Sequence, residues 1–252
     1  MMLKYQIPYD LDSPERTIFH GKIIVENRFL HKIYADWYQT LQKHIPASHS
    51  GRLVELGSGG GFIKEVIPQV VTSDILDLPD VDAQFSALDM PFDDESISAL
   101  LMINTFHHLP DSRAFLDEAD RVLQPGGKII MIEPANSWWG RKIYQNFHHE
   151  DFDPLGSWQI EQDGPLSDAN GALPWIVFER DRSLFVDRYP AFKIGTVAYQ
   201  QPLAYLLSGG FSFRPIVPAA LYPLVKGIDR LLAGLSFNLS LFMLIVVEKG
   251  FD

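Results

Sequence analysis

The sequence predicts an α/β protein, with a mostly parallel β-sheet covered by helices on both faces. Short, continuously apolar segments alternate with helical ones from residue 51 onward, and such apolar segments are typical of strands buried on both sides. The first of them, 52–56, runs directly into a cluster of glycines. A strand that ends in a glycine-rich turn before a helix is typical of parallel sheets that bind a ligand at their edge.

Seven segments have the apolar and β-branched composition of strands. They are 52–56, 69–74, 85–89, 97–104, 128–133, 192–199 and 239–247. The spacing of apolar residues predicts one or two helices over 23–44, ending before Pro46, and an amphipathic helix over 111–123. Further segments of helical character are 62–67, 203–209 and 218–235.

The composition excludes several classes of protein. Of the 252 residues, 46% are hydrophobic and 12% aromatic, which allows a large core and excludes a disordered or fibrous chain. The absence of cysteine excludes a disulfide framework, a thiol nucleophile and a cysteine-based zinc site. The net charge of −11, without a dense basic run, argues against a nucleic-acid partner, because the charge that neutralises phosphates is missing.

One segment, 231–247, is apolar enough to be compared with a membrane span. It is short for a span and is interrupted by glycine, serine and asparagine, so we interpret it as a helix end, a turn and a buried strand. Residues 1–14 lack the long apolar core of a signal peptide. We therefore expect a cytoplasmic protein without a stable span, and peripheral contact with a membrane stays open.

The glycine-rich bend carries the strongest functional signal. It reads Glu55-Leu56-Gly57-Ser58-Gly59-Gly60-Gly61, and such a bend places backbone N–H groups around a ligand at the sheet edge. A dinucleotide-binding fingerprint needs a small residue at position 62, where helix and strand pack closely. The bulky side chain of Phe62 therefore disfavours a nicotinamide-linked oxidoreductase.

Five segments, in order, resemble the class I S-adenosylmethionine-dependent methyltransferases, particularly the small-molecule type. They are 55–61, Asp74 at the end of the second expected strand, 88–96, 104–109 and 121–128. The resemblance covers roughly residues 50–135. It implies a Rossmann-like, doubly wound sheet of seven strands, mostly parallel, with an antiparallel C-terminal strand.

The resemblance also implies which residues bind S-adenosyl-L-methionine. They are Glu55, Gly57, Ser58, Gly59, Gly61, Asp74, Ile75, Asp89, Met90 and Asn104. Asp74 would accept hydrogen bonds from the ribose hydroxyls, and Asp89 from the adenine amino group, with Met90 against the ring. Glu55 would orient the loop or the methionyl amine, and Asn104 would contribute backbone near the methionyl group. A structural role stays open for each of these residues. Asp74 could be an exposed acid at a strand end, and Asp89 could cap the following turn. Glu55 could be a buried acid satisfied by the loop N–H groups, and Asn104 could form a turn at a strand end.

Three histidines are candidates for a catalytic base: His107, His108 and His148. A structural role for the first two stays open. Segment 148–153 has two histidines and three acids, but neighbouring histidines on a regular element point in different directions and no partner cluster is evident. We therefore expect a solvated acidic turn and no metal, although the segment could equally place a base, His148 or Glu150, over the acceptor.

The expected activity is transfer of a methyl group to an uncharged or apolar small molecule by direct displacement. Segment 136–190 breaks the alternation and is rich in aromatic residues, which suits a hydrophobic acceptor. Two alternatives stay open: aminopropyl transfer on the same fold, and a non-catalytic cofactor-binding or interaction module. We expect one domain over 1–252, made of a helical cap (1–50), the cofactor-binding core (51–135), a substrate cap (136–190) and a part that completes the sheet (191–252).

Overall fold

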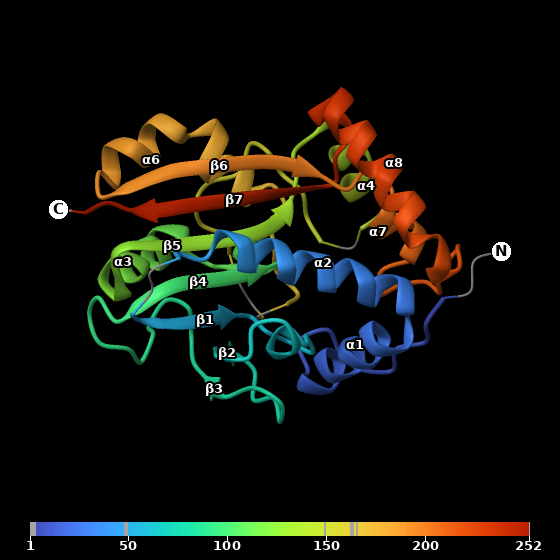
Figure 1. The fold of residues 1–252 in the computed structure, drawn as a ribbon, viewed down its shortest axis with the longest axis horizontal. Helices are drawn as coiled ribbons and strands as arrows, with labels where there is room; N and C mark the ends of the chain where they lie inside the picture. Colours follow the sequence, from blue (N-terminus) through green and yellow to red (C-terminus); the bar gives the residue numbers. More distant parts are fainter. Residues whose placement is uncertain (1–3, 48–49, 149, 162–163, 165, 252) are drawn as a thin grey trace.

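A single seven-stranded sheet organises the chain (Figure 1). The computed structural model describes residues 4–47, 50–148, 150–161, 164 and 166–251. The strands lie in the order β3-β2-β1-β4-β5-β7-β6, and β7 runs antiparallel to both of its neighbours. The expected seven-stranded, mostly parallel sheet with an antiparallel last strand is confirmed.

Six of the expected strands lie where the sequence places them, with small shifts at most ends, although β5 begins at Leu123 rather than at the expected residue 128. The strands are β1 (Arg52–Leu56), β2 (Val70–Asp74), β3 (Ala83–Gln84), β4 (Ile97–Ile103), β5 (Leu123–Pro134), β6 (Phe192–Gln200) and β7 (Phe242–Lys249). The strand expected over 85–89 is wrong, since β3 is only two residues long and precedes it. Ser86 closes a turn there, because its side chain accepts the N–H of Leu88 and its carbonyl oxygen accepts the N–H of Asp89. These two N–H groups are therefore not available for hydrogen bonds to a neighbouring strand.

Helices cover both faces of the sheet, and β4 illustrates the division. Ala99 and Leu101 pack into the core formed with α2, whereas Leu100 and Met102 pack into the core formed with α3. The longer helices are α1 (Pro14–Glu26), α2 (Arg28–His44), α3 (Ser112–Val122), α4 (Trp138–Phe147), α6 (Arg182–Arg188) and α8 (Tyr222–Leu235), and the shorter ones are α5 (Leu173–Trp175) and α7 (Ala204–Ser208).

The helix expected over 62–67 is wrong in extent. Only one 3₁₀ turn, η1 (Ile63–Glu65), forms between the glycine bend and β2. Pro68 disfavours the α conformation at the preceding residue, and β2 begins two residues later. The glycine bend is therefore covered by α1 and α2 rather than by a helix of its own.

Within the described residues, no helix combines the length and the apolar character needed to cross a bilayer. Segment 231–247 divides as expected, because α8 ends at Leu235 and β7 begins at Phe242. Apolar side chains on α8, among them Leu224, Leu231 and Leu235, are exposed. Peripheral contact with a membrane stays a prediction.

Candidate active site

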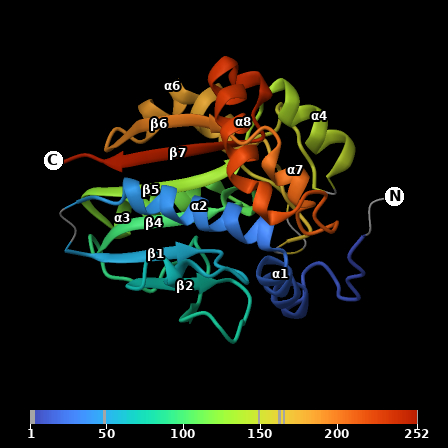
Figure 2. The same cartoon turned by 45° about the vertical axis from the view of Figure 1, so that its right-hand side comes forward.

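A cavity of about 850 Å³ lies at the carboxyl end of the parallel strands. In Figure 2, α1, α4 and α7 lie beyond the arrowheads of these strands. Residues from the glycine bend and from the ends of β2 and β4 line one part of the cavity, and residues from 143–148, 150–152 and 205–216 line another. The cavity therefore brings together the nucleotide-binding edge expected from the sequence and the region expected to select the acceptor.

The glycine bend depends on small residues at two places. Gly57 has a φ of +65°, and a Cβ there would lie 2.5 Å from the Thr105 side chain. A Cβ on Gly60 would collide with the backbone of Gly21 in α1. Both glycines are therefore required by packing, and α1 is held directly against the bend.

Asp74 ties the end of β2 to this bend. Its Oδ2 accepts the N–H of Gly59 at 2.9 Å, and its Oδ1 accepts the N–H of Leu76 at 3.0 Å. The side chain is buried, and this burial raises the pKa of the Asp74 carboxyl despite the two backbone hydrogen bonds. Asp74 lines the cavity and retains acceptor capacity for a ligand that carries hydroxyl groups.

Two buried acceptors that line the cavity have no hydrogen-bond partner among the described residues: Glu55 Oε2 and Asn104 Oδ1. Burial, with a smaller contribution from the nearby Asp74, raises the pKa of Glu55 to about 7. Asn104 has a φ of +52°, in the left-handed region. Unpaired buried acceptors are costly, so this pair suits a ligand that donates N–H groups.

Most of the residues expected to contact the cofactor line this cavity. They are Glu55, Gly57, Ser58, Gly59, Gly61, Asp74, Ile75 and Asn104. The structure does not bring Asp89 and Met90 to it: Asp89 is exposed, and Met90 is buried in the core with its N–H donated to Glu118. The turn at Ser86 directs the chain so that residues 86–88 line the cavity here, and the adenine contacts expected of Asp89 and Met90 stay a prediction.

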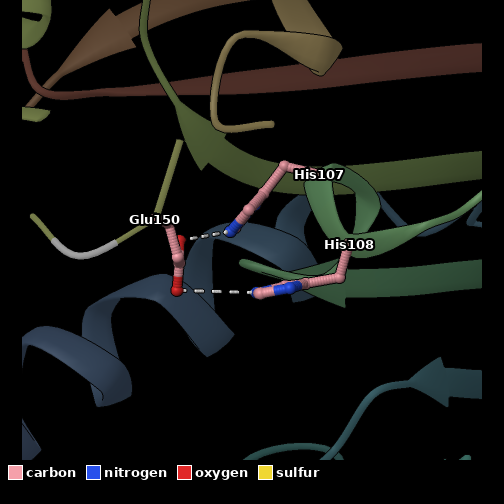
Figure 3. Close-up of side chains that lie close together, drawn as sticks. All are labelled: His107, His108 and Glu150. Carbon is pink, nitrogen blue, oxygen red and sulfur yellow. Dashed lines mark ion pairs between the residues drawn. The ribbon is translucent and has the colours of Figure 1, made fainter. Parts of the chain in front are cut away.

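A histidine–carboxylate cluster lies in the same cavity (Figure 3). His107 is buried between two acids: its Nδ1 lies 2.6 Å from Glu133 Oε2, and its Nε2 lies 3.2 Å from Glu150 Oε2. Glu133, at the end of β5, is fully buried, and its Oε1 accepts the N–H groups of Thr105 and Phe106. The carboxylate of Glu133 therefore fixes both the His107 ring and the turn that carries it.

His108 and His148 also approach Glu150. His108 Nε2 lies 3.8 Å from Glu150 Oε1 and its Nδ1 lies 3.3 Å from the carbonyl oxygen of Asp168, while His148 Nδ1 lies 3.5 Å from Glu150 Oε2. All three candidate histidines therefore meet at one carboxylate.

The two neighbouring rings differ in charge. Burial opposes the charged form of His107, but Glu133 and Glu150 outweigh it and raise the pKa of His107 to about 10. Burial and the charge on His107 lower the pKa of His108 to about 4, and the three histidines hold the pKa of the buried Glu150 far below its usual range. This corner of the cavity thus favours positive charge between two carboxylates.

The acidic turn expected over 148–153 is wrong for Glu150, whose side chain is only 16% exposed and faces the two histidines. His149 lies outside the described residues. Sequence reasoning missed Glu133, although it is an acid at the end of an apolar strand, at the edge where the site was expected.

Residues 54–131 match the sequence model of the family described as the methyltransferase domain. The chain is similar to this family over that segment, which makes up about a third of its length. The resemblance on which the methyltransferase expectation rested is confirmed over that segment.

A demethylmenaquinone methyltransferase from Tropheryma whipplei (strain Twist) is 40% identical over 45 residues, which cover 18% of this chain and 19% of the relative. The chain thus matches about a fifth of the length of the curated relatives.

Solved structures of methyltransferases share the fold over nearly the whole chain. A methyltransferase from Thermotoga maritima superposes with a TM-score of 0.56 at 17% identity, covering 94% of this chain and 97% of that one. A geranyl diphosphate C-methyltransferase from Streptomyces coelicolor A3(2), solved with S-adenosyl-L-homocysteine, gives a TM-score of 0.52 at 13% identity, covering 100% and 93%. The sheet and its covering helices are therefore those of a methyltransferase fold.

Proposed function

We propose that the chain transfers a methyl group from S-adenosyl-L-methionine to an uncharged or apolar small-molecule acceptor. The observation that carries the proposal is that the glycine bend with Asp74 and Glu55 shares one cavity with the histidine–carboxylate cluster. The glycine bend with Asp74 and Glu55 suits the cofactor, and the histidine–carboxylate cluster suits the part of the acceptor that reacts.

The proposed cofactor matches the acceptors that the cavity offers. Asp74 would accept the ribose hydroxyls, and Glu55 and Asn104 would accept the N–H groups of the methionyl amine, which would satisfy the two unpaired oxygen atoms. A cavity of about 850 Å³ lies toward the upper end of ligand-site volumes, about 300–1,000 Å³. This volume leaves room for an acceptor beside the cofactor.

The lining of the whole cavity is mainly apolar, and in this proposal residues 1–50 and 136–190 act as caps over the acceptor. Apolar lining residues include Ile24, Leu109, Ile143, Phe152, Leu206, Phe211 and Phe213. Such a lining favours a hydrophobic acceptor, since each apolar group that it buries adds to binding. Among the relatives, demethylmenaquinone methyltransferase and geranyl diphosphate C-methyltransferase are named for small-molecule acceptors, which supports the same class here.

The chemistry is a direct displacement. An acceptor atom attacks the methyl carbon, the bond between that carbon and sulfur breaks, and the sulfonium becomes the neutral thioether S-adenosylhomocysteine. The protein contributes the approach geometry and the exclusion of water. A proton that leaves the acceptor would pass to His108 or His148, since the raised pKa of His107 keeps that ring protonated near neutral pH.

The test is methyl transfer from S-adenosylmethionine labelled in its methyl group to lipid and small-molecule fractions of a cell extract. We expect label in an organic-extractable product one methyl group heavier than its precursor, with equimolar S-adenosylhomocysteine. In a parallel reaction with decarboxylated S-adenosylmethionine as the donor, a product heavier by an aminopropyl group, formed together with methylthioadenosine, would support the alternative transferase. Cofactor binding with no product from any fraction would support the non-catalytic module and overturn the proposal.

A further inference from the structure

We propose that His107, His108 and Glu150 bind a divalent transition-metal ion of the zinc type in the acceptor part of the cavity. The three side chains lie together in Figure 3, with both imidazole rings directed at one carboxylate. They come from two segments that are far apart in the chain, a turn after β4 and the loop after α4. For this reason neither segment alone carries a metal-binding pattern.

The distances between the donor atoms suit a shared ion. One ligand atom from each residue lies within 4.8 Å of the others, with the Nε2 atoms of His107 and His108 at 3.2 Å and 3.8 Å from the Glu150 oxygen atoms. Zinc bonds to nitrogen and oxygen are about 2.0–2.2 Å, so two ligands of a tetrahedral ion lie about 3.3 Å apart. Only small side-chain adjustments would be needed to admit the ion.

The partners of the ring nitrogens support a metal over a simple ion pair. A histidine that binds a metal through one nitrogen almost always donates the other N–H to a carboxylate or a backbone carbonyl. His107 Nδ1 faces Glu133 at 2.6 Å, and His108 Nδ1 faces the carbonyl oxygen of Asp168 at 3.3 Å. Both rings are thereby oriented with Nε2 toward Glu150, and Glu133 is itself held by two backbone N–H groups.

The neighbouring positions of the two histidines do not prevent a common ligand set. Their rings project from a 3₁₀ turn, η2 (Phe106–His108), with centroids 4.3 Å apart. Two imidazoles and one carboxylate leave coordination positions open, as in catalytic metal sites. All three residues line the cavity, so the open positions are accessible to a ligand in it.

The role of the ion rests on the proposed function. An acceptor hydroxyl that binds at an open position would lose its proton more readily, because the cation stabilises the oxyanion, and His148, which is not a ligand, would take the proton. The oxygen atom would then form its bond to the methyl carbon as the carbon–sulfur bond breaks. Metal binding itself does not depend on this role.

The test is calorimetric titration of chelator-treated, tag-free protein with ZnCl₂, and separately with MnCl₂ and MgCl₂. We expect one zinc site per chain and weak binding of Mg²⁺, which prefers oxygen ligands. His108→Ala and Glu150→Gln should each weaken zinc binding by more than tenfold, and Glu133→Gln by roughly 10–100-fold. His44→Ala is the matched control: this histidine lies on α2, bonded to the Thr40 carbonyl and outside the cavity, and its loss should leave zinc binding unchanged.

A second pair of measurements separates the ligand set from folding and from the proposed function. Co²⁺ bound to the wild-type protein should give visible absorption bands of a nitrogen-containing site, and each variant should be titrated with S-adenosylhomocysteine to show that its cofactor half is folded. A wild-type protein that binds no divalent transition metal, or folded variants that bind zinc as the wild type does, would overturn the metal site and leave the methyltransferase proposal standing. Zinc binding at these residues without any S-adenosylhomocysteine binding would support the metal site and contradict the proposed function.

Discussion

The carboxylate of Asp74 accepts the backbone N–H of Gly59 at 2.9 Å, and so joins the end of β2 to the glycine bend that follows β1. Both residues line the cavity, and the second oxygen of Asp74 holds the N–H of Leu76. One side chain therefore shapes the bend and offers acceptors to whatever the bend holds. This double role gives the first prediction.

Asp74→Ala should weaken binding of S-adenosylmethionine by roughly tenfold or more, because a charged hydrogen-bond acceptor is lost and the N–H of Gly59 loses its partner. Calorimetry measures the affinity. Asp77→Ala is the control, since Asp77 is an exposed carboxylate on the same loop and outside the cavity. Equal affinity in the Asp74 variant and the wild type would contradict the ribose role.

Glu55 should make cofactor affinity depend on pH. Burial raises the pKa of Glu55 to about 7, so the side chain is protonated below that value and can pair with the methionyl ammonium only above it. Affinity for S-adenosylmethionine should rise between about pH 5.5 and 8, and Glu55→Gln should bind more weakly with a flatter profile. Glu65→Gln, at an exposed position, should keep the wild-type profile.

The raised pKa of Glu55 also makes the stability of the ligand-free protein depend on pH. This dependence runs opposite to that of cofactor affinity. Because the pKa of folded Glu55 exceeds the ordinary value of 4.5, the folded state binds the proton more tightly than the unfolded state does. The contribution of Glu55 to the free energy of unfolding should therefore fall as the pH rises from about 4.5 to 7. Urea unfolding at several pH values, compared with Glu55→Gln, measures it, and a contribution that rises over this window would contradict the raised pKa.

Gly60→Ala should lower the free energy of unfolding by about 1–3 kcal/mol, because the new Cβ collides with the Gly21 backbone and pushes α1 away from the bend. Gly227→Ala provides a control of opposite sign. Among the described residues, no atom beyond the neighbouring helix backbone lies within 4 Å of a Cβ at this position in α8, so alanine should stabilise the protein by about 0.5–1 kcal/mol through its helix propensity. Urea unfolding measures both, and equal destabilisation by the two changes would contradict the packing argument.

Asn104 should tolerate glycine better than alanine. Its φ of +52° costs an alanine about 1 kcal/mol, whereas glycine adopts it freely. Urea unfolding should therefore show Asn104→Ala to be less stable than Asn104→Gly. The reverse order would indicate that the backbone relaxes out of the left-handed region.

Much of this fold could be predicted from the sequence because the strands other than the two-residue β3 each carry their own apolar signal. The antiparallel β7, by contrast, was expected from the family resemblance, since a strand's direction leaves no mark on its composition. The strand expected over 85–89 fails because Ser86 uses its side chain and carbonyl to close a turn, a local competition that hydrophobic pattern does not reveal.

The site divides in the same way. Glu55, Asp74 and Asn104 could be placed from the family resemblance because each lies at or next to the end of a recognisable strand, and the ends of parallel strands meet at one edge. The pairing of Glu150 with His107 could not be predicted, because it depends on how an irregular loop returns over the sheet. Glu133 was missed since its burial between the N–H groups of Thr105 and Phe106 is a tertiary feature.

The central claim is that the glycine bend holds the cofactor with its methyl group toward the histidine–carboxylate cluster. A crystal structure with S-adenosylhomocysteine tests it most directly. We expect the ribose hydroxyls within hydrogen-bond distance of the Asp74 carboxylate and the sulfur atom on the side of His107 and Glu150. A ligand bound elsewhere, or a bend that stays empty at saturating ligand, would contradict the account.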